Sequence, residues 1–422
     1  MTQPLDGLAA LDHHLDTTAL VLDLVRAGTA STRSELARLS GLGRAIVTQR
    51  VGELIDSGLL VEGELAPSTG GRAARSLKFP ADAGQLLVAE LGATSIGVGI
   101  SDLSGRLVAQ YEEPAAIAAG PEAILSRVEQ KFDEMLAARP IGSPRVWGVG
   151  IGVPGPVEFS TGRPVAPPIM PGWDRYPVRE RLSRRYGAPT WVDNDVNLMA
   201  LGELRTGLAV GERHVVYIKI GSGIGAGLVS NGRLHRGAQG AAGDIGHVAV
   251  VDDESVVCRC GNIGCLEAVA GGAAIGLQAT AAARAGQSAF LAERLEGRSE
   301  LEAKDVAEAA GYGDAFSVEL LSSAGMTIGR TLATLVNTFN PSLMVIGGGV
   351  AGDLILAGIR QAIYRRSLPL ATRDLRISAS ALGDEAGLRG AAFLVTDELF
   401  SRDRLALLIN GSAAEFDRVS TG

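Results

Sequence analysis

The sequence reads G-D-I-G-H at positions 243–247 and C-R-C-G-N-I-G-C-L-E at positions 258–267. Together the two stretches bring one imidazole and three thiols into the spacing H-x10-C-x-C-x4-C, and these thiols are all the cysteines of the chain. An odd, clustered set favours a metal site over disulfides. The predicted ligands form the closed nitrogen and sulfur set that Zn²⁺ takes at structural sites: His247, Cys258, Cys260 and Cys265. With no open position, the ion is expected to brace a loop, whereas redox chemistry or buried free thiols are the alternatives.

The overall composition limits the class of protein. The 422 residues are 46% hydrophobic and 20% charged, which fits two or three packed soluble domains. A net charge of −8 excludes nucleic-acid binding over the whole surface, but residues 31–80 carry seven Lys/Arg against five Asp/Glu. The N-terminus lacks the pattern of a signal peptide, and no apolar run has the length of a membrane span. We therefore expect a cytoplasmic protein with no membrane partner.

The N-terminal domain, residues 1–80, has the pattern of three helices. Apolar residues recur at helical spacing over 20–25, and T-x-x-E at 32–35 is a capping box that opens a second helix. After the turn G-L-G at 41–43, a third helix is predicted over about 44–57. This order is typical of a helix-turn-helix.

A hairpin follows the third helix. Short strands at 59–61 and 77–79 flank a basic, glycine-containing loop at 66–75. Three helices with a tight turn and then a hairpin predict a winged helix-turn-helix that binds DNA. A three-helix structural or dimerisation module is the alternative, and the basic loop favours the DNA-binding interpretation.

The third helix is expected to enter the major groove with its N-terminal half. Gln49 suits adenine and Ile46 a thymine methyl, while Arg44 and Arg50 are expected to hold phosphates. Arginines of the loop would reach the minor groove or its phosphates. The predicted DNA-contacting residues are Arg44, Ala45, Ile46, Thr48, Gln49, Arg50, Arg72 and Arg75.

Residues 81–400 repeat one layout. Strands at 85–90 and 95–100 open the first half, and strands at 215–220 and 226–229 open the second. The pattern predicts a duplicated α/β fold whose two lobes enclose a ligand cleft. Glycine-rich loops between the strands have backbone N–H groups suited to phosphate. Residues 401–422 are expected to form a C-terminal tail, to which no function is assigned.

Two further motifs carry a family resemblance. V-D-N-D-V-N-L-M-A-L-G-E at 192–203 and G-V-P-G-P at 152–156, with the His/Cys segment, resemble the ROK family of repressors, open reading frames and kinases. The resemblance covers nearly the whole chain, and the N-terminal domain resembles the repressor branch. It implies an actin-like, ribonuclease-H-like two-lobed sugar-kinase fold behind a winged helix-turn-helix.

The same resemblance implies a sugar site. Asp244 stands where the kinases have Glu, so its reach to the sugar is shorter, and both Asp244 and Asp193 have the alternative of being solvated loop acids. His247 is expected to touch the sugar with its metal-bound ring. Carboxylates and amides suit sugar hydroxyls because each accepts or bridges two contacts. The predicted sugar-binding residues are Gly155, Asn194, Asp195, Asp244, His247 and Glu267.

Kinase chemistry would need further parts. Asp195 matches the catalytic base of the family's kinases, and ATP and Mg²⁺ would be required. The first phosphate loop, E-L-G-A-T at 90–94, departs from the family's D-x-G-x-T, because Glu90 places its carboxylate further out and Ala93 adds a β-carbon. Weak or absent kinase activity is therefore expected. The predicted ATP-like loop residues are Gly92, Thr94, Gly221, Ser222, Gly223, Gly347 and Gly348.

Taken together, these patterns predict a sugar-responsive transcriptional regulator, most simply a repressor of carbohydrate-metabolism genes. Its expected partners are operator DNA, a sugar or sugar derivative, and further copies of itself in a dimer or tetramer. An ATP-dependent sugar kinase of the glucokinase or N-acetylhexosamine kinase type is the alternative, as is a protein that does both.

Overall fold

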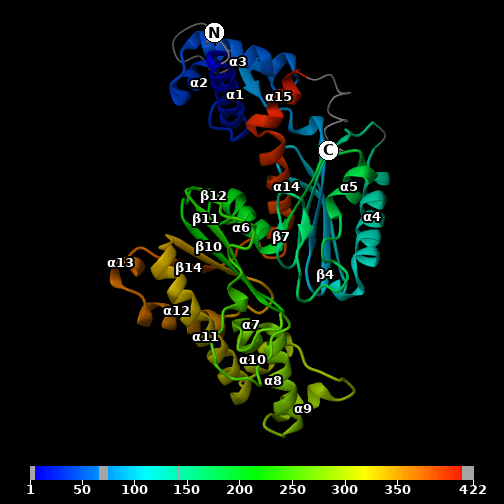
Figure 1. Ribbon diagram of the computed structural model, residues 1–422, viewed down its shortest axis with the longest axis vertical. Helices are drawn as coiled ribbons and strands as arrows, with labels where there is room; N and C mark the ends of the chain where they lie inside the picture. Colours follow the sequence, from blue (N-terminus) through cyan, green and yellow to red (C-terminus); the bar gives the residue numbers. More distant parts are fainter. Residues whose placement is uncertain (1–4, 66–74, 141, 411–422) are drawn as a thin grey trace.

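The chain begins with a three-helix module. The structure is a computed structural model that describes residues 5–65, 75–140 and 142–410. We call residues 5–65 and 75–80 the front module; Figure 1 shows it at one end of the molecule. Its core consists of buried aliphatic side chains such as Leu22, Leu36 and Val51. Its elements are α1 (Leu5–Arg26), α2 (Arg33–Ser40), α3 (Arg44–Asp56), β1 (Val61–Leu65) and β2 (Arg75–Lys78), the two strands being antiparallel.

The start of α2 is fixed by two side chains. The Thr32 hydroxyl accepts a hydrogen bond from the backbone N–H of Glu35 at 3.2 Å. The Glu35 carboxylate in turn accepts one from the backbone N–H of Ser31 at 2.8 Å. The predicted capping box is thus present, with its acidic half reaching one residue further back than in the standard motif.

Two five-stranded sheets form the body. In each, an antiparallel meander of three strands is extended by two parallel strands, in the orders β5-β4-β3-β6-β9 and β12-β11-β10-β13-β14. This repeated order is the duplication expected from the sequence. The strands are β3 (Gln85–Leu91), β4 (Ser95–Asp102), β5 (Leu107–Pro114), β6 (Val146–Val153), β9 (Thr190–Asn194), β10 (Val215–Ile220), β11 (Ile224–Ser230), β12 (Arg233–Leu234), β13 (Leu343–Gly347) and β14 (Arg376–Ala379). A separate hairpin pairs β7 (Val157–Glu158) with β8 (Arg163–Pro164).

Helices cover both faces of each sheet. The helices α4 (Pro121–Ala137) and α5 (Val178–Tyr186) pack on the outer face of the first sheet. The outer face of the second sheet meets α11 (Ala315–Phe339) and α12 (Asp353–Arg366). Between the two sheets lie α6 (Asp195–Thr206) and α14 (Glu385–Leu399), whose apolar residues form one core with both inner faces (Figure 1).

The crossing of α6 and α14 depends on glycine. A β-carbon at Gly202 of α6 would collide with the carbonyl oxygen of Ala386, and one at Gly390 of α14 with that of Leu198. The two backbones therefore approach directly, which joins the inner faces of the lobes.

A group of helices extends the second lobe: α7 (Leu266–Ala270), α8 (Gly272–Arg284), α9 (Ala289–Leu295), α10 (Ala303–Gly311) and α13 (Pro369–Thr372). By length and composition alone, the span Leu266–Arg284 is apolar enough to cross a membrane. It consists of two helices broken at Gly271, and Ile275 and Ala279 are fully buried in the second lobe's core. The span is therefore explained as a core segment. Single 3-10 turns lie at Ala81–Ala83, Ile117–Ala119 and Ile245–His247.

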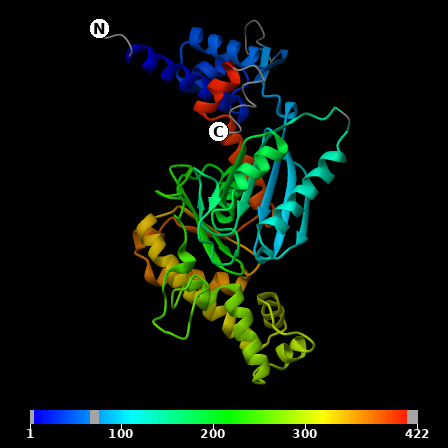
Figure 2. The same cartoon turned by 45° about the vertical axis from the view of Figure 1, so that its right-hand side comes forward.

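The C-terminal helix region packs against the N-terminal front module. The helix α15 (Arg402–Asn410) packs against α1, as Figures 1 and 2 both show. Leu405 is fully buried in the shared core, and Arg402 pairs with Asp16 at 3.3 Å. Residues 401–410 of the expected tail are therefore part of the packed structure, and residues 411–422 lie outside the described residues.

Candidate functional site

A cleft of about 1120 Å³ lies between the lobes. It is lined from the first lobe by the loops after β3 and β6 and from the second by the loops after β10 and β13. The expected sugar-binding residues all line it: Gly155, Asn194, Asp195, Asp244, His247 and Glu267. So do all the expected ATP-like loop residues except Gly347, which packs against the Tyr217 ring instead.

Asn194 is held by its own helix. Its side-chain oxygen caps α6 by accepting from the backbone N–H groups of Val196, at 2.9 Å, and Asn197, at 3.3 Å. Its amide nitrogen donates to the carbonyl of Gly155 at 3.0 Å. Asn194 thereby ties the β6 loop to the start of α6, while a second amide hydrogen stays available for a ligand.

Asp195 meets a cation that sequence reasoning missed. The Lys219 ammonium lies 2.6 Å from Asp195 Oδ2 and 3.9 Å from Glu90 Oε1. Burial alone would lower the pKa of Lys219, but the charges of Asp195 and Glu90 outweigh it and raise that pKa. Burial raises the pKa of Glu90 to about 7, against the opposing charge of Lys219. A lysine inside the otherwise apolar strand V-V-Y-I-K-I was the signal for this site.

Asp193 is also paired across the lobes. It is 2% exposed, so the alternative of a solvated loop acid is wrong for this residue. Its Oδ2 accepts from Arg236 Nε at 2.7 Å, and its Oδ1 from the Asn197 amide at 2.9 Å. The Arg236 guanidinium also stacks on Phe159, 3.9 Å from the ring centre. No local pattern marked Arg236, because its partners lie on distant elements.

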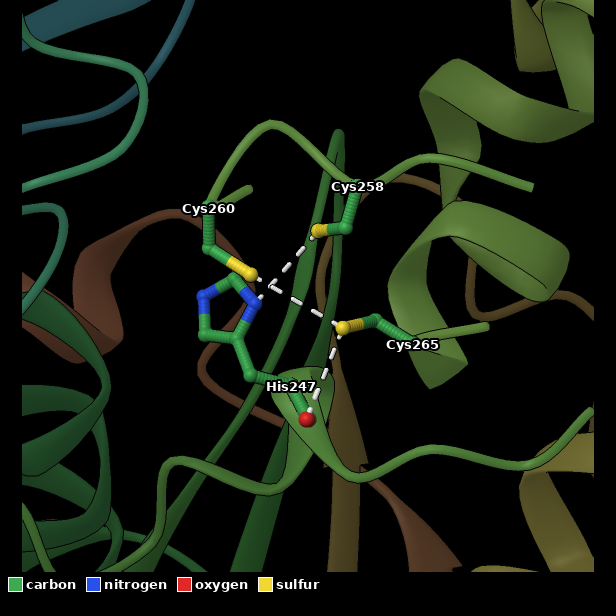
Figure 3. A group of neighbouring side chains, drawn as sticks. All are labelled: His247, Cys258, Cys260 and Cys265. Carbon is green, nitrogen blue, oxygen red and sulfur yellow. Dashed lines mark hydrogen bonds between the residues drawn. The ribbon is translucent and has the colours of Figure 1, made fainter. Parts of the chain in front are cut away.

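Glu267 and His247 connect the cleft to the cysteines. Glu267 Oε1 lies 3.8 Å from His247 Nδ1, and the Glu267 carboxylate fills the space beneath Gly223. The other ring nitrogen of His247 lies 3.8 Å from Asp244, whose side chain is exposed. The His247 Nδ1 is thus directed to the cysteine cluster (Figure 3), and Nε2 is directed to Asp244, which lines the cleft.

The four predicted metal ligands converge. Their ligand atoms lie within 4.8 Å of one another, and Figure 3 shows them pointing to a common centre. The sulfurs of Cys260 and Cys265 are 3.8 Å apart, and Cys258 Sγ is 3.6 Å from His247 Nδ1. A tetrahedral ion with Zn–S bonds of about 2.3 Å would hold two sulfurs about 3.8 Å apart, so the residues fit a structural metal.

The exposed face of α3 carries most of the residues expected to contact DNA. Arg44, Ala45, Thr48 and Gln49 are exposed, and Ile46 is half-buried. Arg75 on β2 is exposed beside Glu62, whereas Arg72 lies outside the described residues.

Arg50 does not share that face. Its side chain is buried, with Nε donating to the Thr17 hydroxyl at 3.0 Å and Nη1 to Glu53 at 3.2 Å. The expectation that Arg50 holds a phosphate is therefore not supported, because helical rotation turns it from the flank of α3 toward α1.

Fold and cleft define a two-lobed sugar-kinase-like body joined to an N-terminal helical module. The family model of the ROK family matches residues 87–398, and the chain belongs to this family. It is 32% identical to a glucokinase of Halalkalibacterium halodurans, over 75% of this chain and 96% of the relative. It is 29% identical to the xylose repressor of Caldicellulosiruptor bescii, over 90% of this chain and 96% of the relative.

A solved structure also matches the chain along most of its length. It is a ROK family transcriptional regulator described as a homologue of the Escherichia coli Mlc protein. The TM-score is 0.81 at 28% identity, with 95% of this chain and all of that chain covered. The glucokinase relative covers 75% of this chain, whereas the xylose repressor covers 90% and the transcriptional regulator 95%, more than the body alone contains.

Proposed function

We propose that this protein is a sugar-responsive transcriptional repressor of carbohydrate-metabolism genes that acts in the cytoplasm. The observation that carries the proposal is the physical union of a sugar-kinase-like cleft with a helix-turn-helix-like front module in one packed chain. The match of repressor relatives over 90% of the chain supports it.

In this proposal the front module is a winged helix-turn-helix. The outward direction of Arg44, Thr48 and Gln49 supports α3 as the recognition helix, since these side chains are exposed. Gln49 would read a base edge, while Arg44 and Arg75 would hold phosphates. A dimer is proposed because paired half-sites need paired recognition helices.

The cleft would bind the sugar. Asp195, His247 and Glu267 offer a carboxylate, an imidazole and a second carboxylate that face one space, and sugar hydroxyls suit all three. Asn194 would add a donor and would also hold the Gly155 loop over the ligand.

The path of α14 supports coupling between cleft and front module. Its first turn lines the cleft through Glu385 and Leu388, and its length packs on α6 between the lobes. Phe400, directly after α14, packs on Phe79 of the front module with ring centres 5.4 Å apart. A sugar that binds one arrangement of the lobes better than another would shift α14 and so change DNA affinity.

We propose Zn²⁺ as the ion of the His/Cys cluster. His247, Cys258, Cys260 and Cys265 would hold it in a closed set that supplies structural bracing. The bracing would fix the His247 ring toward the sugar and keep Glu267 beneath the glycine loop. Because the set leaves no open position, no chemical step is assigned to the ion.

Phosphoryl transfer is the less supported alternative. Asp195 is present for it, but its carboxylate is engaged by Lys219. The cleft lining also carries nine Asp/Glu side chains against three Lys/Arg, which disfavours a nucleoside triphosphate. Release of ADP from ATP with glucose, xylose or N-acetylated hexosamines, abolished by Asp195→Asn, would favour a kinase.

The decisive experiment uses the full chain. A duplex selected by the protein from a random pool is titrated by fluorescence anisotropy, with and without each sugar of a panel. We expect tight, salt-dependent binding that one sugar class changes by about 5–150-fold. Failure to retain any duplex at low salt, or an affinity unchanged by every sugar, would contradict the proposal.

A further inference from the structure

The Lys219 ammonium sits between two carboxylates of the opposite lobe. Lys219 belongs to β10 of the second sheet, whereas Glu90 belongs to β3 of the first sheet and Asp195 begins α6. Its distances are 2.6 Å to Asp195 and 3.9 Å to Glu90, and all three side chains line the cleft.

The two carboxylates have little freedom to separate. Glu90 is packed against the first turn of α14, where a β-carbon at Gly387 would collide with its carboxylate. Asp195 is held by a hydrogen bond from the backbone N–H of Val196 at 2.9 Å. The side chains of Asp195 and Glu90 are only 5% and 12% exposed. Two acids fixed near each other away from water need a cation or a proton between them.

We propose that Lys219 is a specificity-determining residue of the cleft. Its ammonium supplies, from the chain itself, the positive charge that a divalent cation or a metal–nucleotide complex would bring to Glu90 and Asp195. The cleft therefore takes an uncharged sugar alone. The identity of the ligand as a sugar rests on the proposed function, whereas the role of Lys219 as an internal cation does not.

This role also changes what Asp195 can do. A carboxylate oxygen that already accepts a short bond from an ammonium is a weaker acceptor for a proton of a sugar hydroxyl. The pair therefore suits recognition of a hydroxyl, with Asp195 held in one orientation, better than removal of its proton. Lys219 acts on the ligand through Asp195 and is in that sense a positioning residue.

Lys219→Met tests the proposal in the full chain without any sugar or DNA. At a pH above the pKa of Glu90, Mn²⁺ binding is measured by calorimetry and by the melting temperature. Wild type should not bind Mn²⁺ in the cleft, whereas the variant should bind it at least about tenfold more tightly, a modest effect for the removal of one opposing positive charge. The double variant Lys219→Met/Glu90→Gln should lose this gain.

Lys304→Met is the matched control. Lys304 lines the same cleft but pairs at 2.7 Å with the exposed Glu302. It should leave Mn²⁺ binding as in wild type. A folded Lys219→Met protein that binds Mn²⁺ no better than wild type overturns the proposal.

Asp195→Asn gives an independent readout if Lys219→Met fails to fold. At a pH below the pKa of Glu90, where Glu90 is protonated, removing the Asp195 carboxylate leaves the ammonium without a charged partner. Inorganic phosphate should then raise the melting temperature of the variant and not of wild type. The magnesium complex of a non-hydrolysable ATP analogue should leave the melting temperature of wild type unchanged. Stabilisation of wild type by that complex, or no response of Asp195→Asn to phosphate, counts against the internal cation. Absence of DNA binding would leave all of these results standing.

Discussion

The guanidinium of Arg26 lies 4.3 Å from the centre of the Phe400 ring and 5.6 Å from that of Phe79. Arg26 ends α1 of the front module, and Phe400 follows the last residue of α14. One cation thus contacts Phe79 of the front module and Phe400 at the end of α14, which fixes the front module to the helix that lines the cleft.

Phe400→Ala should weaken the contact between the front module and α14. Phe400 is 3% exposed, and truncation of a buried phenylalanine costs about 3–5 kcal/mol of unfolding free energy. Chemical denaturation should show that loss, and the sugar-induced change in DNA affinity should shrink while sugar binding itself persists. Phe290→Ala is the control, since Phe290 stacks on Tyr312 at the same 5.4 Å centre distance, far along the chain from the front module. If Phe400→Ala keeps the full sugar response, α14 does not carry the coupling between the cleft and the front module.

Gln49→Ala should change base preference. Gln49 is exposed on α3, and one good base contact is worth about 1–3 kcal/mol of discrimination. Anisotropy with single-base variants of the selected duplex should lose discrimination at one position. Arg75→Ala should instead weaken all duplexes alike and flatten the salt dependence. Unchanged base preference in Gln49→Ala would show that α3 lies differently on DNA.

Arg50→Ala should act on stability. Because Arg50 is buried and bonded to Thr17 and Glu53, its loss should lower the free energy of unfolding by about 1–3 kcal/mol. The salt dependence of DNA binding should stay as in wild type. Arg44 is an exposed arginine of the same helix, so Arg44→Ala should leave the free energy of unfolding unchanged and flatten the salt dependence of DNA binding. A flatter salt dependence of DNA binding in Arg50→Ala would show that Arg50 does contact a DNA phosphate.

His247→Ala should remove the metal and the sugar response together. The ring both closes the cysteine cluster and faces the cleft, so metal analysis should show loss of the ion, and sugars should no longer raise the melting temperature. DNA binding by the front module should persist, because the cluster lies in the second lobe. His235→Ala, an exposed histidine outside the cluster, should change neither property. Full metal content in His247→Ala would show that the cysteines suffice.

Stability should depend on pH through Glu90. Burial raises the pKa of Glu90 from 4.5 to about 7 in the folded protein. Between these two pH values, Glu90 is protonated in the folded state and ionised in the unfolded state. Its contribution to stability is complete below the unfolded value and is lost as pH rises toward 7, by about 3 kcal/mol at most. The stability of Glu90→Gln relative to wild type should therefore rise with pH across this window. Glu112→Gln is the control, because Glu112 is an exposed acid of the same cleft. If the stability difference between Glu90→Gln and wild type does not change with pH, the raised pKa of Glu90 is contradicted.

Local pattern predicted much of the fold. The strand over 215–220 has the expected bounds, because a short apolar run between turns leaves little choice. The helix α11 was not predicted, although Leu321, Ile328 and Val336 recur at helical spacing, since glycine and serine between them weaken the apolar pattern. The metal ligands were predictable from ligand type and spacing alone.

Partners from distant elements were not predictable. Lys219 and Arg236 neutralise acids that lie 24 and 43 positions away in sequence. Only the folded arrangement of the two lobes brings them together. The inward turn of Arg50 escaped prediction for the same reason, because a buried arginine needs a partner on another helix, here Thr17 of α1.

The docking of α15 on α1 bears on how the protein is made. The front module is synthesised before α15, yet α15 supplies part of the apolar surface that covers it, including Leu405. Until α15 has been synthesised, that surface of the front module is exposed to water and to other chains. Synthesis of α15, and not of the front module alone, would then be the step that completes the core of the front module.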